Sequence, residues 1–479
     1  MTTRLSIYCD KLLEAGWLAA LIVAPLYFDV YSSRVFEPDK ATLVRSLALV
    51  MVGAWLVKQL EIGWRAASPN EAAPPPDRAP LAQAVRAILR DNPFALPVFA
   101  IVTTYVIATI FSVVPDISLW GSYQRLQGTY STFSYIAISV IAASALHTRA
   151  QLDRAVNTVL VVSFPIAFYG ILQHFRLDPL PWGGDTVDRV AANMGNSIFV
   201  AAYLIMAVPL ALARWLETLA RATRPSAARA LPIAMVTLFL AVLSVLWMLD
   251  FALGTVLALA CIVSAGVFAL IAKTSFRDAL LTATYTVLLA VLFVGVFFTQ
   301  SRGPWLGLAG GLFAFIVLYA LTRGARQVVV IAIGLTIVAS AFLAVFNLPS
   351  SPLDPLKQVP YVGRLGRIFE TESGTGKVRE LIWEGALPLV LPHPPIWSPT
   401  TGDDPFNAIR PLVGYGPEAM YVAFNPFYPP DLAHYESRNA SPDRSHNETF
   451  DSLVMTGLLG FGAYILLFVS VFYFGLKWL

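Results

Sequence analysis

Charged side chains are scarce in this sequence. Only 13% of its 479 residues are Asp, Glu, Lys or Arg, which is about half the charged fraction of ordinary soluble proteins. So few charges cannot cover the surface of a soluble protein of this length. The scarcity therefore argues against a set of soluble domains.

Cysteine is also rare, and several catalytic signatures are missing. Cys9 and Cys261 are the two cysteines, and their distance along the chain indicates no disulfide framework. The sequence has no phosphate-binding glycine-rich loop, no zinc-type His/Cys cluster, no nucleophile elbow and no CxxC pair. Nucleotide-dependent, zinc-dependent and thiol-redox chemistries are therefore not indicated.

Long apolar runs fill most of the chain instead. Hydrophobic residues make up 57% of it, and about 20 apolar residues span a bilayer as a helix. Because lipid cannot satisfy open backbone groups, helices are the expected spanning elements. The predicted fold is an all-α polytopic membrane protein, a single membrane domain over 1–479. The predicted spans are Leu12–Tyr31, Leu43–Leu60, Phe94–Val114, Thr129–His147, Ala155–Phe175, Ser197–Leu216, Leu231–Leu249, Phe251–Ile271, Ala279–Thr299, Trp305–Leu321, Val328–Phe346 and Leu453–Leu476.

The basic residues of the connectors predict the orientation. Short cytoplasmic connectors carry an excess of Lys and Arg. With the N-terminus inside, the inner segments hold fifteen, namely Arg4, Lys11, Arg65, Arg78, Arg86, Arg90, Arg149, Arg154, Arg221, Arg224, Arg229, Lys273, Arg277, Arg323 and Arg326. The short outer connectors hold six, namely Arg34, Lys40, Arg125, Arg176, Arg189 and Arg302. Both termini are therefore predicted to be cytoplasmic.

Two connectors are long. Glu61–Pro93 is rich in Pro and Ala and is predicted to be a cytoplasmic linker, whose closing LAQAVRAILR would lie along the membrane surface. Asn347–Ser452 is predicted to be an ordered extracytoplasmic loop, because it is rich in aromatic residues. Within it, VRELIWEGALPLVL indicates a short helix with Ile382, Trp383, Ala386, Leu387 and Val390 on one side. The first apolar run is expected to stay as a span, and the natural chain to continue beyond Leu479.

Three outer arginines are candidates for binding an anion. Arg302 lies in a tight connector, where Gly303 and Pro304 favour a turn followed by a new helix. Arg125 and Arg189 each precede a span. Guanidinium groups suit phosphate oxygens, and a helix N-terminus attracts anions. The simpler alternative is that each arginine reaches the lipid headgroups as an interfacial anchor.

His446 is the candidate catalytic base. It lies just before the last span, and imidazole can take a proton near neutral pH. Asn447, Glu448 and Asp451 are close enough in sequence to orient the ring. A lone histidine in a polar loop is more often a bystander, and His393 and His434 are weaker candidates. The acidic pair Glu37 and Asp39 is the alternative as a metal site, whereas Asp403 and Asp404 suggest a solvated turn.

Six stretches together resemble the O-antigen ligase and polymerase family of bacterial membrane glycosyltransferases. They are WGSYQRLQGTYSTFSY, RVAANMGNSIFVAAYL, SRGPWLGLAGG, VRELIWEGALPLV, GYGPEAM and SHNETFDSLVMTGLLGFGAY. The resemblance extends from Trp120 to Tyr464. It departs from the commoner pattern after Gly195, where Asn-Ser-Ile stands instead of Asn-Pro-Asn.

The resemblance implies a site and a reaction. His446 and Arg302 would be the functional His and Arg, with Arg189, Arg125 and Arg379 as further residues for the donor pyrophosphate. The donor would be a glycan on a polyprenyl pyrophosphate such as undecaprenyl pyrophosphate, and the acceptor a hydroxyl of a glycan, glycolipid or protein. The resemblance further implies inverting transfer without metal or cofactor, on the outer face of the bacterial inner membrane, where the chain contributes to the cell envelope.

Other functions remain open at this point. Within the family, a repeat-unit glycan polymerase and a protein O-oligosaccharyltransferase share the chemistry and differ in the acceptor. A small-anion transporter would also place arginines near spans, but it would have polar or broken helices near the midplane, and these spans look clean. A structural membrane subunit is the remaining possibility.

Overall fold

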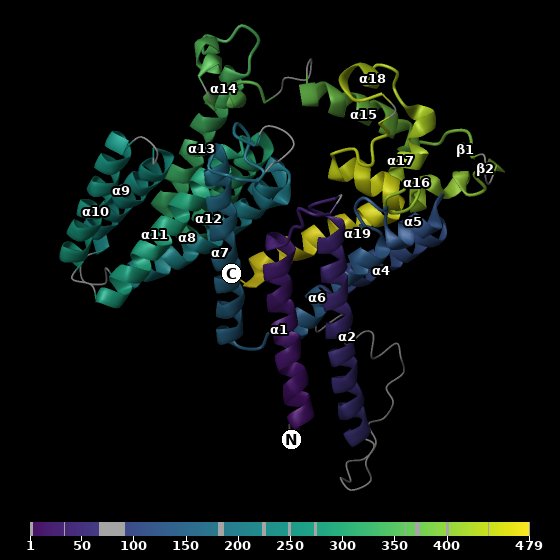
Figure 1. Ribbon diagram of the computed structural model, residues 1–479, viewed down its shortest axis with the longest axis horizontal. Helices are drawn as coiled ribbons and strands as arrows, with labels where there is room; N and C mark the ends of the chain where they lie inside the picture. The colour runs from purple at the N-terminus through teal and green to yellow at the C-terminus, as the bar shows by residue number, and fades with distance from the viewer. Residues whose placement is uncertain are drawn as a thin grey trace. The chain divides into compact units, whose positions relative to one another are not determined.

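In the residues that the computed structural model describes, twelve helices coincide with the predicted spans (Figure 1). The structure describes residues 3–66 except 33, 92–180, 186–222, 227–247, 251–272, 275–368 except 360, 374–398 and 402–478 except 439. The long helices are α1 (Arg4–Leu26), α2 (Pro38–Ala66), α4 (Ala95–Ile110), α6 (Thr129–Ala145), α7 (Arg149–His174), α8 (Ser197–Ala222), α9 (Ala227–Leu246), α10 (Phe251–Ala272), α11 (Phe276–Phe298), α12 (Arg302–Thr322), α13 (Arg326–Phe346) and α19 (Glu448–Trp478). Each corresponds to one predicted span.

The helices have the length and composition of membrane spans. Among the described residues, eight are long and apolar enough to cross a membrane, and α4, α6 and the Pro232–Leu246 part of α9 are apolar but shorter. The prediction of an all-α polytopic membrane protein is thus confirmed. Helix α1 carries Arg4, Asp10, Lys11 and Glu14 in its N-terminal half, and its crossing stays a prediction.

In its described residues, the loop before α19 is partly helical, as predicted. It contains η2 (Asp354–Gln358), α14 (Val362–Leu365), α15 (Gly374–Val390), the antiparallel strands β1 (Trp397–Ser398) and β2 (Gly402–Asp403), η3 (Asn407–Ile409), α16 (Arg410–Val413), α17 (Met420–Ala423), η4 (Asn425–Phe427) and α18 (Leu432–Tyr435). Among the described residues outside this loop, the short elements are α5 (Pro115–Trp120) and η1 (Ala192–Met194).

Helix α2 continues through Ala66 and so includes the first residues of the predicted linker Glu61–Pro93, Gly63 among them. The linker itself stays a prediction. The predicted surface helix LAQAVRAILR lies outside the described residues.

By their contacts, the chain's parts form two compact units. Unit 1 comprises Met1–Ala20, Glu37–Leu146 and Glu370–Leu479, and unit 2 comprises Leu21–Phe36 and His147–Phe369. The expectation of a single membrane domain stays a prediction. Each unit has its own buried apolar cluster, so each is described by itself.

Unit 2 is built around α11. This helix packs against α7, α8 and α9, and Leu289 and Leu292 on it are fully buried. Gly295 permits the contact with α7, since a Cβ at that position would come within 2.9 Å of the Ala167 side chain. By contrast, α12 and α13 bury little of their apolar windows, 6% and 0%, as expected for helices whose outer surface lipid covers.

In unit 1, α15 packs against α16, α18 and α19. Its buried side is formed by Val378, Leu381, Ile382, Ala386 and Leu389. The predicted buried side of this helix was partly wrong, since Leu387 is 49% exposed. The helix is rotated so that Leu381 and Leu389, which were not predicted to be buried, face the core. Trp383 lies at the edge of this face and stacks on Phe450.

Helix α19 is broken at Gly457, so the expectation of clean spans is wrong for the last one. Gly457 has φ 64° and ψ −168°, a left-handed conformation that glycine adopts without strain. The backbone of the 414–416 segment fills the break: the Tyr415 N–H donates to Val454 O (2.8 Å) and the Gly416 N–H to Met455 O (2.9 Å). Freed carbonyls inside a membrane helix are tolerated when other protein groups satisfy them.

Candidate active site

His446 sits at a rigid turn at the start of α19. The carboxylate of Asp451 accepts hydrogen bonds from the N–H and the hydroxyl of Ser445, each at 2.7 Å. The indole N–H of Trp383 donates to Ser445 O at 2.9 Å. Ser445 is fully buried, whereas His446 is exposed and adopts a left-handed φ of 56°. Helices α15 and α19 thus fix the turn and leave the imidazole accessible.

The predicted supporting residues act on the turn and not on the ring. Among the described residues, neither Asn447 nor Asp451 hydrogen-bonds to the imidazole of His446. Asn447 accepts a hydrogen bond from the Thr449 N–H at 3.0 Å, and so caps the first turn of α19. In this structure the two side chains support the turn, and their direct action on the ring stays a prediction.

The surroundings of His446 favour its neutral form. Desolvation by the surrounding protein and the positive charge of Arg379 lower the pKa of the imidazole, against the opposing charges of Asp443 and Asp451. Arg379 comes from α15 and is half-buried. A neutral imidazole near pH 7 has a free nitrogen lone pair, so His446 can accept a proton.

Arg125 also belongs to this cluster, but it is already paired. Its Nε lies 2.6 Å from Asp443 Oδ2 and 3.7 Å from Glu37 Oε2. Burial raises the pKa of the Glu37 carboxyl, and the charge of Arg125 opposes this shift. Glu37, proposed with Asp39 as an alternative metal site, thus contacts a guanidinium. No group of three or more potential metal ligands occurs in the described part of the chain.

The loop 121–128, which presents Arg125, is held from two sides. The carboxylate of the buried Glu418 accepts hydrogen bonds from the N–H groups of Ser122 and Gln127. On the other side, the guanidinium of Arg45 donates to Trp120 O at 2.5 Å and to Leu126 O at 2.7 Å. Two buried charges of opposite sign therefore fix one short connector.

The sequence analysis assigned no role to Glu418 or Arg45. A signal was available for Arg45, because an arginine inside an apolar span is expensive unless it has partners. For Glu418 the signal was weaker. GYGPEAM was noted as part of the family resemblance, but the partner amides lie 296 and 291 positions away.

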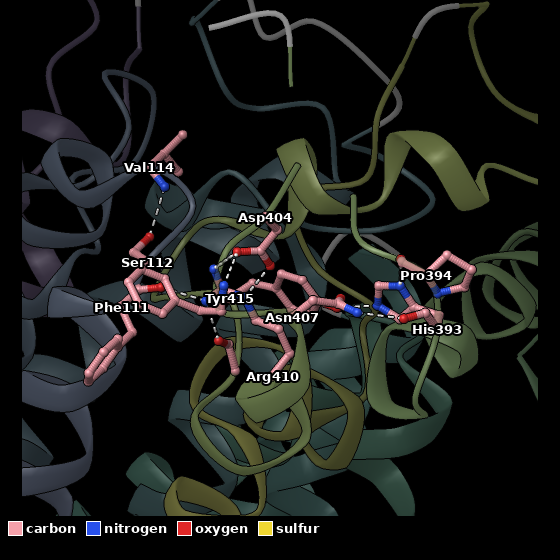
Figure 2. Close-up of polar contacts among 11 residues, drawn as sticks. Phe111, Ser112, Val114, His393, Pro394, Asp404, Asn407, Arg410 and Tyr415 are labelled. Atoms are coloured by element: carbon pink, nitrogen blue, oxygen red, sulfur yellow. Dashed lines mark hydrogen bonds and ion pairs between the residues drawn. The ribbon is translucent and has the colours of Figure 1, made fainter. Parts of the chain in front are cut away.

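A buried network anchors the 404–418 segment to the end of α4 (Figure 2). Arg410 donates through Nε and Nη2 to both carboxylate oxygens of Asp404, at 2.6 and 2.7 Å. It also donates to the carbonyl oxygens of Phe111 and Gly414. Arg410 and Asp404 are only 2% and 9% exposed, so the interpretation of Asp404 as part of a solvated turn is wrong.

Tyr415 extends this network to His393. Its hydroxyl hydrogen-bonds His393 Nε2, and the other ring nitrogen, Nδ1, lies 2.6 Å from Pro394 O. Burial raises the pKa of the Tyr415 hydroxyl. Although burial alone would raise the pKa of Asp404, its hydrogen bonds from Arg410 and the charge of that guanidinium lower it. The guanidinium of Arg410 lies over the Tyr415 ring, 5.1 Å from its centroid, so the buried Tyr415 contacts both His393 and the ion pair.

In unit 2, Arg302 and Arg189 lie on adjoining connectors. Arg302 begins α12, and its Nη1 donates to Arg367 O. Gln300, two residues earlier, donates through its side chain to Asp188 O at 2.5 Å. The Val190 N–H donates to Phe298 O at 3.3 Å. Hydrogen bonds of Asp188 and Val190, the two neighbours of Arg189, thus join the connector before η1 to the connector before α12.

The Arg189 connector is fixed by Gln173. Its side-chain oxygen accepts hydrogen bonds from the N–H groups of Ala191 (3.2 Å) and Ala192 (2.7 Å). The structure therefore brings the predicted site residues together in two sets. His446, Arg379 and Arg125 lie in unit 1, and Arg302 and Arg189 lie in unit 2.

The chain is a polytopic membrane protein, because it has many apolar helices long enough to span a bilayer. A polar, partly helical loop precedes the last of them. Residues 285–465 match the family model of the O-antigen ligase, so the chain carries an O-antigen ligase family domain. This match confirms the resemblance that the motifs indicated. It includes Arg302, Arg379 and His446 but neither Arg125 nor Arg189. No curated protein and no solved structure matches the chain.

Proposed function

We propose that this protein transfers a glycan from a polyprenyl-pyrophosphate carrier to an acceptor hydroxyl on the outer face of the membrane, as an O-antigen ligase does. The family domain supports a glycosyltransferase of the O-antigen ligase or polymerase type. One observation carries the finer proposal: His446 lies exposed on a rigid turn within that domain, with a lowered pKa.

His446 would act on the acceptor. Its neutral imidazole takes the proton of the acceptor hydroxyl while the oxygen attacks the anomeric carbon. The bond between that carbon and the pyrophosphate oxygen breaks, and the polyprenyl pyrophosphate leaves with both electrons. A direct displacement of this kind inverts the anomeric centre.

The arginines would act on the donor. Arg302 with Arg189, and Arg379 in the neighbourhood of His446, supply the positive charge that a departing pyrophosphate needs. This charge could replace a metal ion, so we expect transfer to proceed in EDTA. Arg125 pairs with Asp443 and Glu37, which favours a role in organising the site. Its contact with the donor pyrophosphate stays a prediction.

The broken helix bears on the alternative of an anion transporter. A discontinuous helix can expose backbone groups to a transported ion. Here, however, the Val454 and Met455 carbonyls at the break of α19 accept hydrogen bonds from the 414–416 segment. Because backbone groups of the protein occupy the break, it offers no path for an ion. This observation favours the enzyme over the transporter.

The test is glycan transfer by purified protein in liposomes with a lipid-linked glycan donor and an acceptor. General-base contributions are typically about 10²- to 10⁴-fold. His446→Ala should lose that much of the transfer rate and still bind donor, because the donor pyrophosphate does not need the base. The matched control is His434→Ala, an exposed histidine of the same loop. Near wild-type transfer by His446→Ala would remove it as the base.

A further inference from the structure

A polar cavity lies between α4, α6 and α19 in unit 1, and the reaction proposed above makes no use of it. Its volume is about 230 Å³. Its lining includes Tyr105, Gln127, Tyr135, Arg444, Glu448 and Tyr464. Glu448 is exposed and Tyr135 is 46% exposed, so the cavity is open to the outside of the protein.

The cavity gathers polar side chains from helices that are otherwise apolar. Tyr105 belongs to α4, Tyr135 to α6 and Tyr464 to α19. Polar groups within membrane helices are expensive, face the protein interior or a water-filled cavity, and mark substrate pathways. Three such residues from three helices line one cavity, and this convergence indicates a polar ligand.

These polar groups have hydrogen-bonding capacity to spare. Among the described residues, the Tyr464 hydroxyl makes no hydrogen bond, and the Glu448 carboxylate accepts one, from the Ser452 hydroxyl at 3.4 Å. The Arg444 guanidinium donates through Nη2 to Gln127 Oε1. Since its other N–H groups have no hydrogen-bond partner in the described part of the chain, they remain for a ligand.

The chemistry of the lining matches a neutral sugar ring. Sugar hydroxyls donate and accept, so the Glu448 carboxylate can accept from them while the Arg444 N–H groups donate to them. The C–H faces of a sugar ring are apolar and pack on aromatic rings such as that of Tyr464. A ligand with a full charge would be repelled by either the carboxylate or the guanidinium. The cavity is smaller than the about 300–1,000 Å³ of drug-sized sites, so it suits one ring.

The cavity and the proposed base share one turn. Arg444 and Glu448 line the cavity, and His446 lies between them in the sequence. Asp451, which holds this turn through Ser445, is itself part of the cavity wall. A sugar ring bound there would therefore lie on the element that presents the imidazole.

We propose that this cavity binds one neutral sugar ring of the acceptor, with Glu448 and Tyr464 contacting its hydroxyl groups. The inference rests on the proposed function and deepens it. It names the class of acceptor, because a glycan or glycolipid has such a ring and a protein side chain has none. The repeat-unit polymerase and the ligase share this requirement, whereas a protein O-oligosaccharyltransferase lacks it.

The test is binding of the methyl glycosides of glucose, galactose, mannose and N-acetylglucosamine to the full chain in nanodiscs, by saturation-transfer NMR. Detergents with sugar head groups are left out, because they would compete. At least one glycoside should bind. Glu448→Gln should bind it about tenfold more weakly, as expected for a lost hydrogen bond to a charged group, and Tyr464→Phe should also weaken it. Unchanged thermal unfolding shows that the variants are folded.

Matched controls exist for both variants. Glu436→Gln changes an exposed carboxylate of the same loop, and Tyr473→Phe changes a tyrosine of α19 that is 60% exposed. Neither residue lines the cavity, so both variants should bind the glycoside as the wild type does.

A cysteine at Ser452 places the bound ligand, in a protein with Cys9 and Cys261 replaced by Ser. Ser452 lines the cavity, so the glycoside should slow the reaction of this cysteine with a thiol reagent. A cysteine at exposed Ser437 should react at the same rate with and without the glycoside. This readout needs no change at Glu448 or Tyr464, and so does not depend on the folding of those variants.

The proposal is overturned if none of the four glycosides binds, as expected of a merely hydrated cavity. It is also overturned if a serine-containing peptide protects the cysteine at Ser452 and no glycoside does, because the acceptor would then be a protein. Normal glycoside binding by both Glu448→Gln and Tyr464→Phe would overturn it as well. Failure of the proposed function looks different: the wild type would bind the glycoside in the cavity and transfer no glycan.

Discussion

The imidazole of His446 is tuned by a neighbouring side chain that belongs to another helix. Arg379 on α15 is one of the charges that lower its pKa. The charge disfavours the imidazolium, and so keeps the imidazole of the proposed base neutral when the pH falls. Since the turn itself is held by Ser445, Asp451 and Trp383, the electrostatic effect can be separated from the geometry.

Removing the charge of Arg379 should change the pH dependence of transfer. In Arg379→Gln the pKa of His446 rises, more of the imidazole is protonated at mildly acidic pH, and the rate falls there. At alkaline pH the imidazole is neutral in both proteins, so any remaining difference reports donor binding. The measurement is the pH profile of kcat/KM, with Arg379→Lys as the variant that keeps the charge. A uniform loss with an unmoved acidic midpoint would contradict the coupling.

The sequence motifs identified only some of the residues of the candidate active site. His446 and Arg302 were identified because a histidine before a span and an arginine in a tight outer connector are unusual in themselves. Arg45, Glu418 and the Arg410–Asp404 pair depend on contacts between distant segments, which local patterns do not record. Arg125 was identified, but its carboxylate partner Asp443 lies 318 positions further along the chain.

Among the elements, the 404–418 segment depends on one buried ion pair. Removing one partner of such a pair leaves an uncompensated buried charge, which destabilises by about 3–5 kcal/mol. Arg410→Met should therefore lower the free energy of unfolding by roughly that amount, and the loop 121–128 should loosen with it through Glu418.

Replacing both partners gives the control. The double variant R410M/D404L removes the stranded carboxylate and should recover part of the stability lost in Arg410→Met. Denaturant unfolding, followed by Trp fluorescence, measures both variants. If the double variant is as unstable as the single one, the hydrogen bonds from Arg410 to the Phe111 and Gly414 carbonyls outweigh the ion pair.

The break in α19 makes a second prediction about an element. Gly457→Ala is expected to destabilise the protein strongly, because a Cβ there would lie 2.3 Å from the backbone of Leu412 and would force a left-handed φ on a residue with a side chain. Gly462→Ala, on the same helix with open space around it, should be tolerated. Thermal stability in detergent distinguishes the two, and equal tolerance would mean that α19 can run straight.

For the whole molecule, the orientation stays a prediction. It rests on fifteen inner against six outer basic residues. In a protein with Cys9 and Cys261 replaced by Ser, a cysteine at exposed Ser437 should react with an impermeant maleimide added to intact cells. One at exposed His147 should react only after the cells are opened. The reverse pattern would overturn the topology.

Hydropathy predicted the twelve helices well, because a bilayer demands about 20 apolar residues whatever the neighbours are. Positions such as Leu289, buried in α11, and Leu335, exposed on α13, carry the same apolar signal. In a membrane, apolar character therefore does not reveal which side of a helix meets protein. For the same reason, the sequence did not indicate that contacts would form two units.

The hydrogen bonds from the 414–416 segment into the break of α19 set the limits of any exchangeable module. A chimera that imports only the loop 347–452 from a relative would meet a foreign final helix, whose glycine and free carbonyls need not match. Transplanting residues 404–464 as one piece keeps Gly414, Gly457 and their partners together. An exchange between relatives should therefore be cut within α19 after Gly457, and not at the start of that helix.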